Sequence, residues 1–245
     1  MNRLIIGLLV FFIINFDSEA QNGKTVFAFY EYKVEGYQLT NFINGYKRDL
    51  EWHAEKNDSW DWVGWFVMTG DRRGNFIDAT PNHLWKDFDE WNINGAENLK
   101  HNIIHWLPYV SDPNGSFRVL LSKLSNIGPD WYKSKLLKVI YFDVYSDRVV
   151  QFSELLNEIT PIMEKQQPNA TFAWMRTSTG GPGNYVLFLC ANSYEELGVI
   201  ETNFSESLPK LKEQSINTYK LCVKSTFEEL WSYNAYLSQY GENGK

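Results

Sequence analysis

Charged side chains recur at alternate positions of several strand-like segments, and they are the first residues in this chain that could do chemistry. Successive side chains of a β-strand point to opposite faces, so residues two apart share a face. This alternation predicts that one enclosed face carries three acids and three bases. They are Glu31, Asp78, Asp143, Arg118, Arg176 and Lys220. Convergent charges can orient a polar small molecule, although mutual pairing of buried charges is the simpler explanation.

Large aromatic rings are predicted on the same face, which would let it hold a flat ligand as well as a polar one. The rings are Phe29, Trp65, Tyr141, Trp174 and Tyr185. A flat molecule can stack on such rings while the charges fix its orientation. The predicted ligand-binding residues are Glu31, His53, Trp65, Asp78, Asp143, Trp174 and Arg176. The pattern assigns no catalytic residue.

Histidine and tryptophan are concentrated in one part of the chain. All four histidines and seven of the ten tryptophans lie between Trp52 and Trp106. Exposed tryptophans would suit stacking on a sugar or another flat ligand, but tryptophan is usually largely buried. Core packing is therefore the simpler explanation of this cluster.

The histidines do not form a convincing metal site. Glu97, His101 and His105 follow one another at intervals of four, on one stripe of a predicted helix. Two imidazoles one turn apart can share a metal ion, but the third residue lies two turns from the first and no HExxH pattern occurs. We predict no metal site. His53 stands near the end of another predicted helix, where the helix dipole alone explains a histidine.

The elements that position these residues follow the same order twice. Each half begins with an alternating strand, "TVFAFYEYKV" from Thr25 and "LLKVIYFDVY" from Leu136. Helical patterns follow at 39–56 and 149–166, and then come hairpins with the turns "GDRRGN" and "TGGPGN". A gap-free alignment of the hairpins pairs Trp65 with Trp174. A second helix and a last strand, "SFRVLLSK" or "TYKLCVKS", complete each half.

This order predicts an α+β protein made of two ferredoxin-like βαββαβ repeats, at 21–126 and 127–245. The second repeat is predicted to end in an additional helix over "FEELWSYNAYLSQYGENGK". Each antiparallel sheet would carry helices on one face only and leave a bare face. We therefore predict that the two sheets pack together into an intrachain α/β barrel, as a tandem internal duplication.

The predicted arrangement is similar to the dimeric α/β-barrel superfamily, which includes antibiotic-biosynthesis-type monooxygenases, haem-degrading monooxygenases and chlorite dismutases. The resemblance covers most of the chain after residue 20 and lies in topology, without a family-specific catalytic motif. It implies a fold that hosts many chemistries. The residues themselves predict no cofactor. The resemblance leaves haem open as a cofactor, which His53 could help to dock. Because these folds complete themselves by pairing two units, an internal duplication predicts a monomer.

The two cysteines are predicted to be free and mostly buried. Cys190 and Cys222 fall on the predicted third and fourth strands of the second repeat. In the ferredoxin-like strand order 4-1-3-2 these strands are about 9.6 Å apart, beyond the roughly 7 Å that a disulfide spans.

The first twenty residues predict export. Arg3 precedes an apolar run over 4–16, and Ser18-Glu19-Ala20 is an acceptable cleavage site. Loss of residues 1–20 removes Arg3, Asp17 and Glu19 and changes the net charge from −7 to −6. This acidic balance argues against nucleic acid as a partner, and no later stretch could cross a membrane. We expect a periplasmic or extracellular protein.

The predicted function is non-catalytic binding of a small polar or aromatic-stacking ligand. A cofactor-independent or haem-linked monooxygenase, suggested by the resemblance alone, and a structural or partner-binding protein stay open as alternatives. No G-x-S-x-G, P-loop or dinucleotide motif occurs. Hydrolase and nucleotide-dependent functions therefore have no support from individual residues.

Overall fold

The computed structural model describes residue 23 and the ranges 25–207 and 213–241. The predicted signal peptide lies outside these residues. Within them the chain forms a mixed α+β fold with eight strands and five α-helices. The strands are β1 (Val26–Val34), β2 (Val63–Val67), β3 (Phe76–His83), β4 (Val110–Leu120), β5 (Leu136–Val144), β6 (Thr171–Gly180), β7 (Tyr185–Ala191) and β8 (Val223–Tyr233). The helices are α2 (Leu39–Glu55), α3 (Gly95–His105), α4 (Val149–Gln166), α5 (Tyr194–Ser207) and α6 (Glu213–Cys222).

The eight strands pair antiparallel in one closed barrel, in the order β1-β3-β2-β8-β5-β7-β6-β4. The first half contributes β4-β1-β3-β2 and the second half β8-β5-β7-β6, so the predicted strand order 4-1-3-2 is found in both. The halves join where β2 pairs with β8 and where β4 pairs with β6. The internal duplication itself remains a prediction, because the shared order does not establish common descent.

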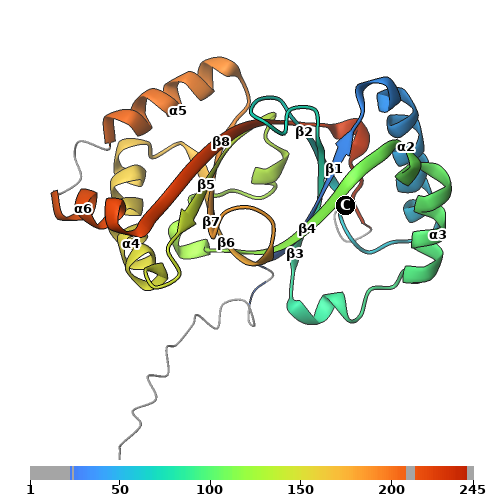
Figure 1. Cartoon of the computed structure of the whole chain (residues 1–245), viewed down its shortest axis with the longest axis horizontal. Coiled ribbons are helices and arrows are strands. Elements are labelled where there is room, and N and C mark those ends of the chain that lie inside the picture. Colours follow the sequence, from blue (N-terminus) through green and yellow to red (C-terminus); the bar gives the residue numbers. More distant parts are fainter. Residues whose placement is uncertain (1–22, 24, 208–212, 242–245) are drawn as a thin grey trace, which may run out of the picture.

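The helices cover the outside of this sheet in two separate layers (Figure 1). α2 and α3 lie over the first half, and α4, α5 and α6 lie over the second. α2 forms because Phe42, Tyr46 and Leu50 recur at helical spacing and bury against the sheet. α3 begins where the Asn94 side chain accepts hydrogen bonds from the first free amides of the helix. Gly45 lets α2 approach the carbonyl of His105 closely.

Three apolar cores hold these layers together. One fills the barrel interior with large rings, among them Phe27, Phe29, Trp65, Phe188 and Trp231. The other two lie between the sheet and each helical layer. In the first half, Trp60, Trp62 and Trp106 are buried in the layer under α2. Packing therefore accounts for much of the tryptophan cluster, in agreement with the simpler explanation.

The predicted face of three strands is wrong. Ile77 pairs opposite Trp65, so Ile77 and Ala79 face the interior while Asp78 faces α2. On β6 and β7, Trp174 pairs with Leu187, and both belong to the outer core of the second half. Trp65 and Ile77 pair in the first hairpin, and the gap-free alignment matches them with Trp174 and Val186. The alignment therefore predicts that Trp174 pairs with Val186. The second hairpin is one residue longer, so the alignment inverts the face of β6. On β3 and β7 the alignment holds, since Ile77 and Val186 both face the interior, and the prediction chose the wrong one of the two alternating sets of residues.

The predicted end of the second repeat is also wrong. Residues 218–222 of the expected last strand, including Lys220, belong to helix α6, and the first residues of the expected closing helix, 227–233, belong to strand β8. Phe227, Glu229 and Trp231 alternate toward the interior, where Arg72 pairs with Glu229. A charged residue at an inward position hides the alternation in the sequence, because it breaks the apolar pattern on which the prediction depends.

Cys190 and Cys222 are free and buried, as predicted. The strand argument holds only for Cys190, which lies on β7 in the barrel interior; Cys222 is the last residue of α6. Among the helices that the structure describes, none combines the length and apolar character needed to cross a membrane.

Candidate functional site

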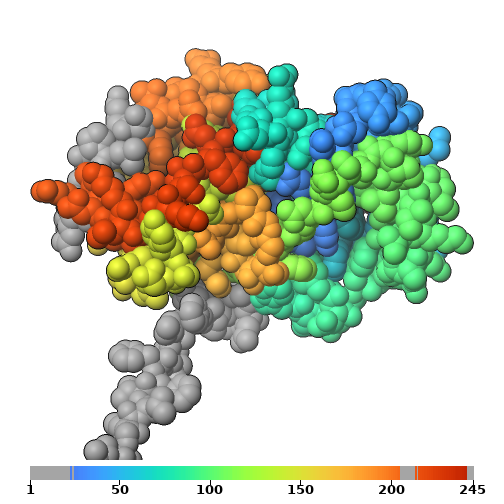
Figure 2. All heavy atoms as spheres, in the orientation of Figure 1, coloured from blue at the N-terminus to red at the C-terminus, as the bar shows by residue number. Residues whose placement is uncertain are grey.

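A vestibule opens at one end of the barrel, where the β2–β3 turn meets β4, β8 and the β6–β7 turn. These four segments converge at the centre of the face in Figure 2. The vestibule encloses about 680 Å³. A smaller inner pocket of about 20 Å³ lies next to it and is lined by Phe29, Tyr141 and Trp231. Glu31, Arg72, Asn114 and Pro182 line both spaces. The volume of the vestibule falls in the range of small-molecule sites.

Arg72 lies between the vestibule and the inner pocket. Its guanidinium donates to both carboxylate oxygens of Glu229, at 2.9 and 2.6 Å, to Glu31, and to the Tyr141 hydroxyl at 2.8 Å. Burial alone would lower the pKa of Arg72, but the hydrogen bond to Glu229 and the charges of Glu31 and Glu229 raise it above its ordinary value. Arg72 is therefore a permanent cation whose hydrogen bonds reach β1, β5 and β8 at the mouth.

Arg118 supplies a second, more deeply buried cation. Its side chain comes from β4 and lies over the rings of Phe29 and Tyr141, at 5.7 and 5.4 Å. Nη2 donates to the carbonyl of Pro182 at 3.0 Å, whereas Nη1 is buried and has no hydrogen-bond partner among the described residues. Burial lowers the pKa of Arg118, yet a guanidinium stays charged in proteins. A buried cation with an unused donor is suited to an anionic oxygen.

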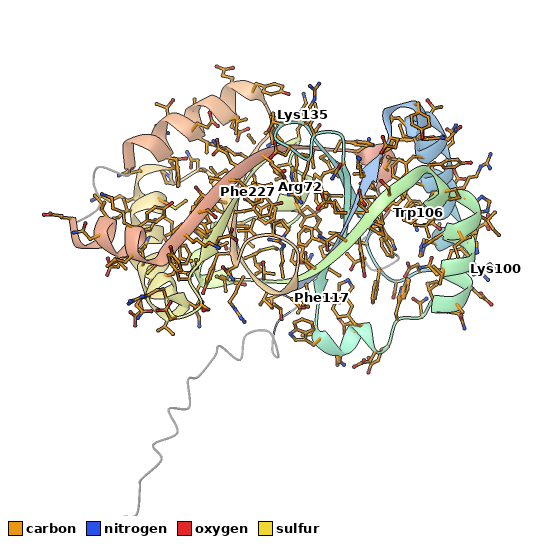
Figure 3. All side chains as sticks on the ribbon, in the orientation of Figure 1. Arg72, Lys100, Trp106, Phe117, Lys135 and Phe227 are labelled. Atoms are coloured by element: carbon orange, nitrogen blue, oxygen red, sulfur yellow. The ribbon has the colours of Figure 1, made fainter. Side chains whose placement is uncertain are left out.

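A pair of stacked aromatic rings lies between the two spaces, with Phe227 lining the vestibule and Tyr141 lining the inner pocket. Tyr141 stacks on Phe227 with their centroids 4.4 Å apart, and Arg72 lies over both rings. Burial raises the pKa of Tyr141 to about 12, so its hydroxyl stays protonated at neutral pH. Figure 3 shows Arg72 and Phe227 next to each other at the centre of this face. A flat molecule could extend this stack.

The charged residues around the vestibule are mostly acidic. Glu31, Asp71, Asp112, Glu228 and Glu229 line it, with only Lys33 and Arg72 as cations among the described residues. Lys33 also pairs with Glu35 at 3.3 Å. An anion entering from solvent would meet this negative rim, whereas a neutral molecule with O–H or N–H donors would not be repelled.

Two of the seven predicted ligand-binding residues contribute to this region. Glu31 lines both the vestibule and the inner pocket, where Asn75 also donates to it at 2.7 Å. Trp65 is buried in the interior beneath, against Phe29 and Trp231, and its indole donates to the carbonyl of Tyr132. Asp143, further along β5, accepts from Ser225 at 2.9 Å and lines neither space.

Asp78, Trp174 and Arg176 lie on the outer faces of their strands, contrary to the predicted interior position. Asp78 is buried under α2 and accepts from the Tyr46 hydroxyl at 2.6 Å. Burial is the main cause that raises the pKa of Asp78 to about 7, and the hydrogen bond from Tyr46 only partly opposes it. Trp174 lies in the outer core of the second half, and Arg176 stands opposite the outward-facing Tyr185 on β7.

His53 lies in the aromatic layer beneath α2 and lines neither the vestibule nor the inner pocket. Its Nδ1 is 2.8 Å from a carboxylate oxygen of Asp58, and its ring packs beside Trp62 and Trp91. Asp58 also accepts from the indoles of these two tryptophans. Packing and hydrogen bonding within the helical layer therefore account for this histidine.

The sequence pattern does not single out Arg72 or Glu229, although they are central to the site. Arg72 stands in a turn whose glycines are its clearest sequence feature, and Glu229 falls in a segment predicted to be helical. The one available signal is the alternation of Phe227, Glu229, Trp231 and Tyr233, which matches a strand with one charged inward position.

Haem, which the resemblance suggested, does not fit the cavities of the described residues. Haem iron takes histidine, cysteine, methionine or tyrosine as its protein ligand. No histidine, cysteine or methionine lines the vestibule, the inner pocket or a further apolar cavity beneath α4. Their tyrosines are Tyr30, Tyr141 and Tyr219, whose pKa values are all raised by burial, which disfavours the phenolate. Within the described residues, no group of three or more His, Cys, Asp and Glu could hold a metal ion.

Comparison with known proteins shows which class of fold this architecture belongs to. No protein-family model matches the chain, and no curated protein matches it in sequence. Its structure is similar to a monooxygenase-like protein of Lactobacillus acidophilus NCFM, with 9% identity over 86% of this chain and 94% of the other and a TM-score of 0.56. It is also similar to chlorite dismutase from Candidatus Nitrospira defluvii, with 8% identity over 89% and 94% and a TM-score of 0.56.

A third structure, an anthrone oxidase-like protein, matches with 8% identity over 89% of this chain and 94% of that chain, at a TM-score of 0.53. The likenesses cover most of each chain, and identities of 8 and 9% show the fold alone. The protein therefore has the α+β fold shared by monooxygenase-like and chlorite dismutase-like proteins.

Proposed function

We propose that the protein is a cofactor-independent oxygenase that acts on a small, flat, neutral molecule bound in the vestibule. The observation that carries the proposal is Arg118, a buried cation whose Nη1 lacks a partner among the described residues. Such a group would stabilise negative charge that develops on a substrate oxygen. The likeness to monooxygenase-like and anthrone oxidase-like proteins agrees with this reaction class.

The substrate would carry an acidic CH2 group that is conjugated with a carbonyl through an aromatic ring, as an anthrone does, so that its carbanion places negative charge on that oxygen. The acidic rim favours its neutral form on entry, and the Tyr141–Phe227 stack would hold its ring. Glu31, which lines both spaces, would accept the proton, and the oxyanion of the resulting carbanion would lie against Arg118. Molecular oxygen then takes the electrons at that carbon. Overall, a CH2 group and O2 become C=O and H2O.

Arg72 would have to move for a substrate to reach Arg118. The inner pocket holds about 20 Å³, room for one water molecule. Arg72 lines both spaces and comes from a turn bounded by Gly70 and Gly74, both at positive φ. We infer that a displacement of this turn would join the vestibule to the inner pocket and place the substrate under both guanidinium groups.

Oxygen uptake with anthrone as the probe tests this function. The native protein should consume oxygen and form the quinone, whereas Arg118→Met should lower kcat about 100-fold, the usual loss of one oxyanion donor. Arg176→Met is the matched control, because Arg176 stands beside the same strand but on the outer face; its kcat should stay within twofold. Uptake by R118M equal to that of the native protein would reject the proposal.

Non-catalytic binding is the second candidate, favoured by the complete engagement of Arg72 in the closed arrangement. If Arg72 stays in place, a ligand would occupy the vestibule without reaching Arg118. Quenching of tryptophan fluorescence by anthrone, without oxygen uptake, would support this candidate. Equal quenching in R118M would then be expected, because the ligand would not contact Arg118.

We also propose that the protein is exported, that it is a monomer and that its two halves arose by tandem duplication. Export rests on the pattern of residues 1–20. A monomer is supported by the strand pairing, since each of the eight described strands is paired on both edges. A tandem duplication is supported by the equal strand order of the two halves.

A further inference from the structure

A second, apolar cavity lies on the outside of the sheet in the second half, and it shares one lining residue, Glu228, with the vestibule. It encloses about 490 Å³ between the sheet and the helices α4 and α6. Phe152, Leu156 and Ile159 line it from α4, and Ile216 and Tyr219 line it from α6. The corresponding layer of the first half is packed with the large rings of Trp60, Trp62 and Trp106. The layer between sheet and helices is therefore filled by side chains in the first half, whereas in the second half it contains a cavity.

The floor of the cavity follows one row of residues across the sheet. Trp174 on β6 pairs with Leu187, Leu187 with Ile140, and Ile140 with Glu228 on β8. Three strand spacings make this row about 14 Å long. Trp174 is buried at one end, whereas Glu228 at the other end is exposed, so the cavity is apolar within and polar at its rim.

The buried end carries an unused hydrogen-bond donor. Trp174 is 2% exposed, and its Nε1 has no acceptor among the described residues. An unsatisfied buried donor is rare in native proteins and calls for a partner such as a bound ligand. The rim carries hydrogen-bonding groups: Tyr219 is hydrogen-bonded to Thr226, and Glu228 pairs with Lys138 at 3.0 Å. Lys138 also binds Glu201 at 2.7 Å, so its charge is already matched by two carboxylates.

We propose that this cavity binds an elongated, neutral, apolar molecule with one oxygen acceptor, of the class of long-chain alcohols. The apolar walls take its body, and Trp174 Nε1, which is itself buried, would donate to its oxygen after a small rotation of the indole. A fatty-acid anion is disfavoured, because its carboxylate would be buried beside Trp174 without a cation among the described residues that line the cavity. Haem is excluded from this assignment, since no histidine, cysteine or methionine among the described residues lines the cavity and burial raises the pKa of Tyr219.

Displacement of a neutral fluorophore tests the proposal on the full chain. N-phenyl-1-naphthylamine should bind with saturation at one site, and 1-decanol should displace it at least tenfold better than decanoate at pH 8. Ile216→Trp, which fills the cavity, should weaken the fluorophore at least tenfold. Leu221→Trp is the control on the same helix, because Leu221 is 65% exposed and does not line the cavity; its affinity should stay within twofold.

A third variant isolates the indole donor. Trp174→Phe keeps an aromatic ring but removes Nε1–H, so 1-decanol should bind about fivefold more weakly while the fluorophore binds within twofold of the native protein. Equal displacement by decanoate and decanol, or an unchanged affinity in I216W, would overturn the proposal. The proposal would also be overturned if haemin shifted its Soret band on binding to the native protein and this shift were absent in I216W. R118M should leave all these affinities unchanged, so failure here and failure of the oxygenase proposal are separate outcomes.

Discussion

Replacement of Arg72 by methionine is the sharpest test of how the mouth of the barrel is held together. Arg72 binds Glu229 through two hydrogen bonds, and the Glu229 side chain is only 2% exposed. Removal of one partner from a buried pair typically costs about 3–5 kcal/mol, because it leaves the other charge uncompensated. Trp231 still donates to Glu229 at 3.1 Å, so we place R72M near the lower end, at about 3 kcal/mol.

Glu31 adds little to this estimate. Its side chain is 15% exposed and keeps the hydrogen bond from Asn75, so loss of its pairing should cost less than about 1 kcal/mol. The double variant R72M/E229Q removes the uncompensated charge and should recover about 2 kcal/mol of the free energy of unfolding.

Urea unfolding followed by tryptophan fluorescence measures these differences. Arg73→Met, in the same turn but exposed, is the matched control and should change the free energy of unfolding by less than about 0.5 kcal/mol. If R72M lost less than about 1 kcal/mol, or if R72M/E229Q recovered nothing, the buried pairing could not be what stabilises the mouth.

Two other predictions concern the first half of the protein. The folded-state pKa of Asp78 is about 7, above the roughly 3.9 of an aspartate in an unfolded chain. The folded protein therefore holds the proton of Asp78 more tightly than the unfolded chain does. Its free energy of unfolding should fall by about 4 kcal/mol as pH rises from 4 to 8. Asp78→Asn should remove most of that slope in urea unfolding at several pH values, and an unchanged slope would assign it to other groups. Gly45→Ala would place its Cβ 2.0 Å from the His105 carbonyl oxygen, so we expect a loss of about 2–3 kcal/mol from overpacking; a thermal midpoint equal to that of the native protein would show that α3 can shift freely.

The order of the strands in the sheet could be predicted because it follows from the succession of helices and strands along the chain. The faces on which the side chains lie could not be predicted for every strand. The faces of β1 and β5 agree with the prediction, since their inward positions are nearly all apolar or aromatic. The β6–β7 hairpin has one residue more than the β2–β3 hairpin, and the gap-free alignment could not accommodate it. The error passed to Trp174 and Arg176 because each face assignment depends on the register of the strand before it.

The site was harder to predict for a related reason. Glu229 is acceptable inside the barrel only because Arg72 is there, and Arg72 is inward only because its turn folds over the mouth. Each residue looks surface-like when read alone, and their sequence positions are 157 residues apart. Hydropathy patterns describe residues singly, so a buried pair of this kind is invisible until the two strands β2 and β8 are known to adjoin.

The contrast between the two cavities follows from this packing. The vestibule has charges whose partners come from β1, β4, β5, β8 and the β2–β3 turn, so it depends on the closure of the whole barrel. The apolar cavity depends on the second half alone, through β5, β6, β8 and the helices above them. A change that loosens the junction of β2 with β8 should therefore disturb the vestibule first and leave the apolar cavity intact. Glu228 is the one described residue that lines both spaces, so substitutions elsewhere in either lining should affect one site and not the other, which agrees with distinct ligands.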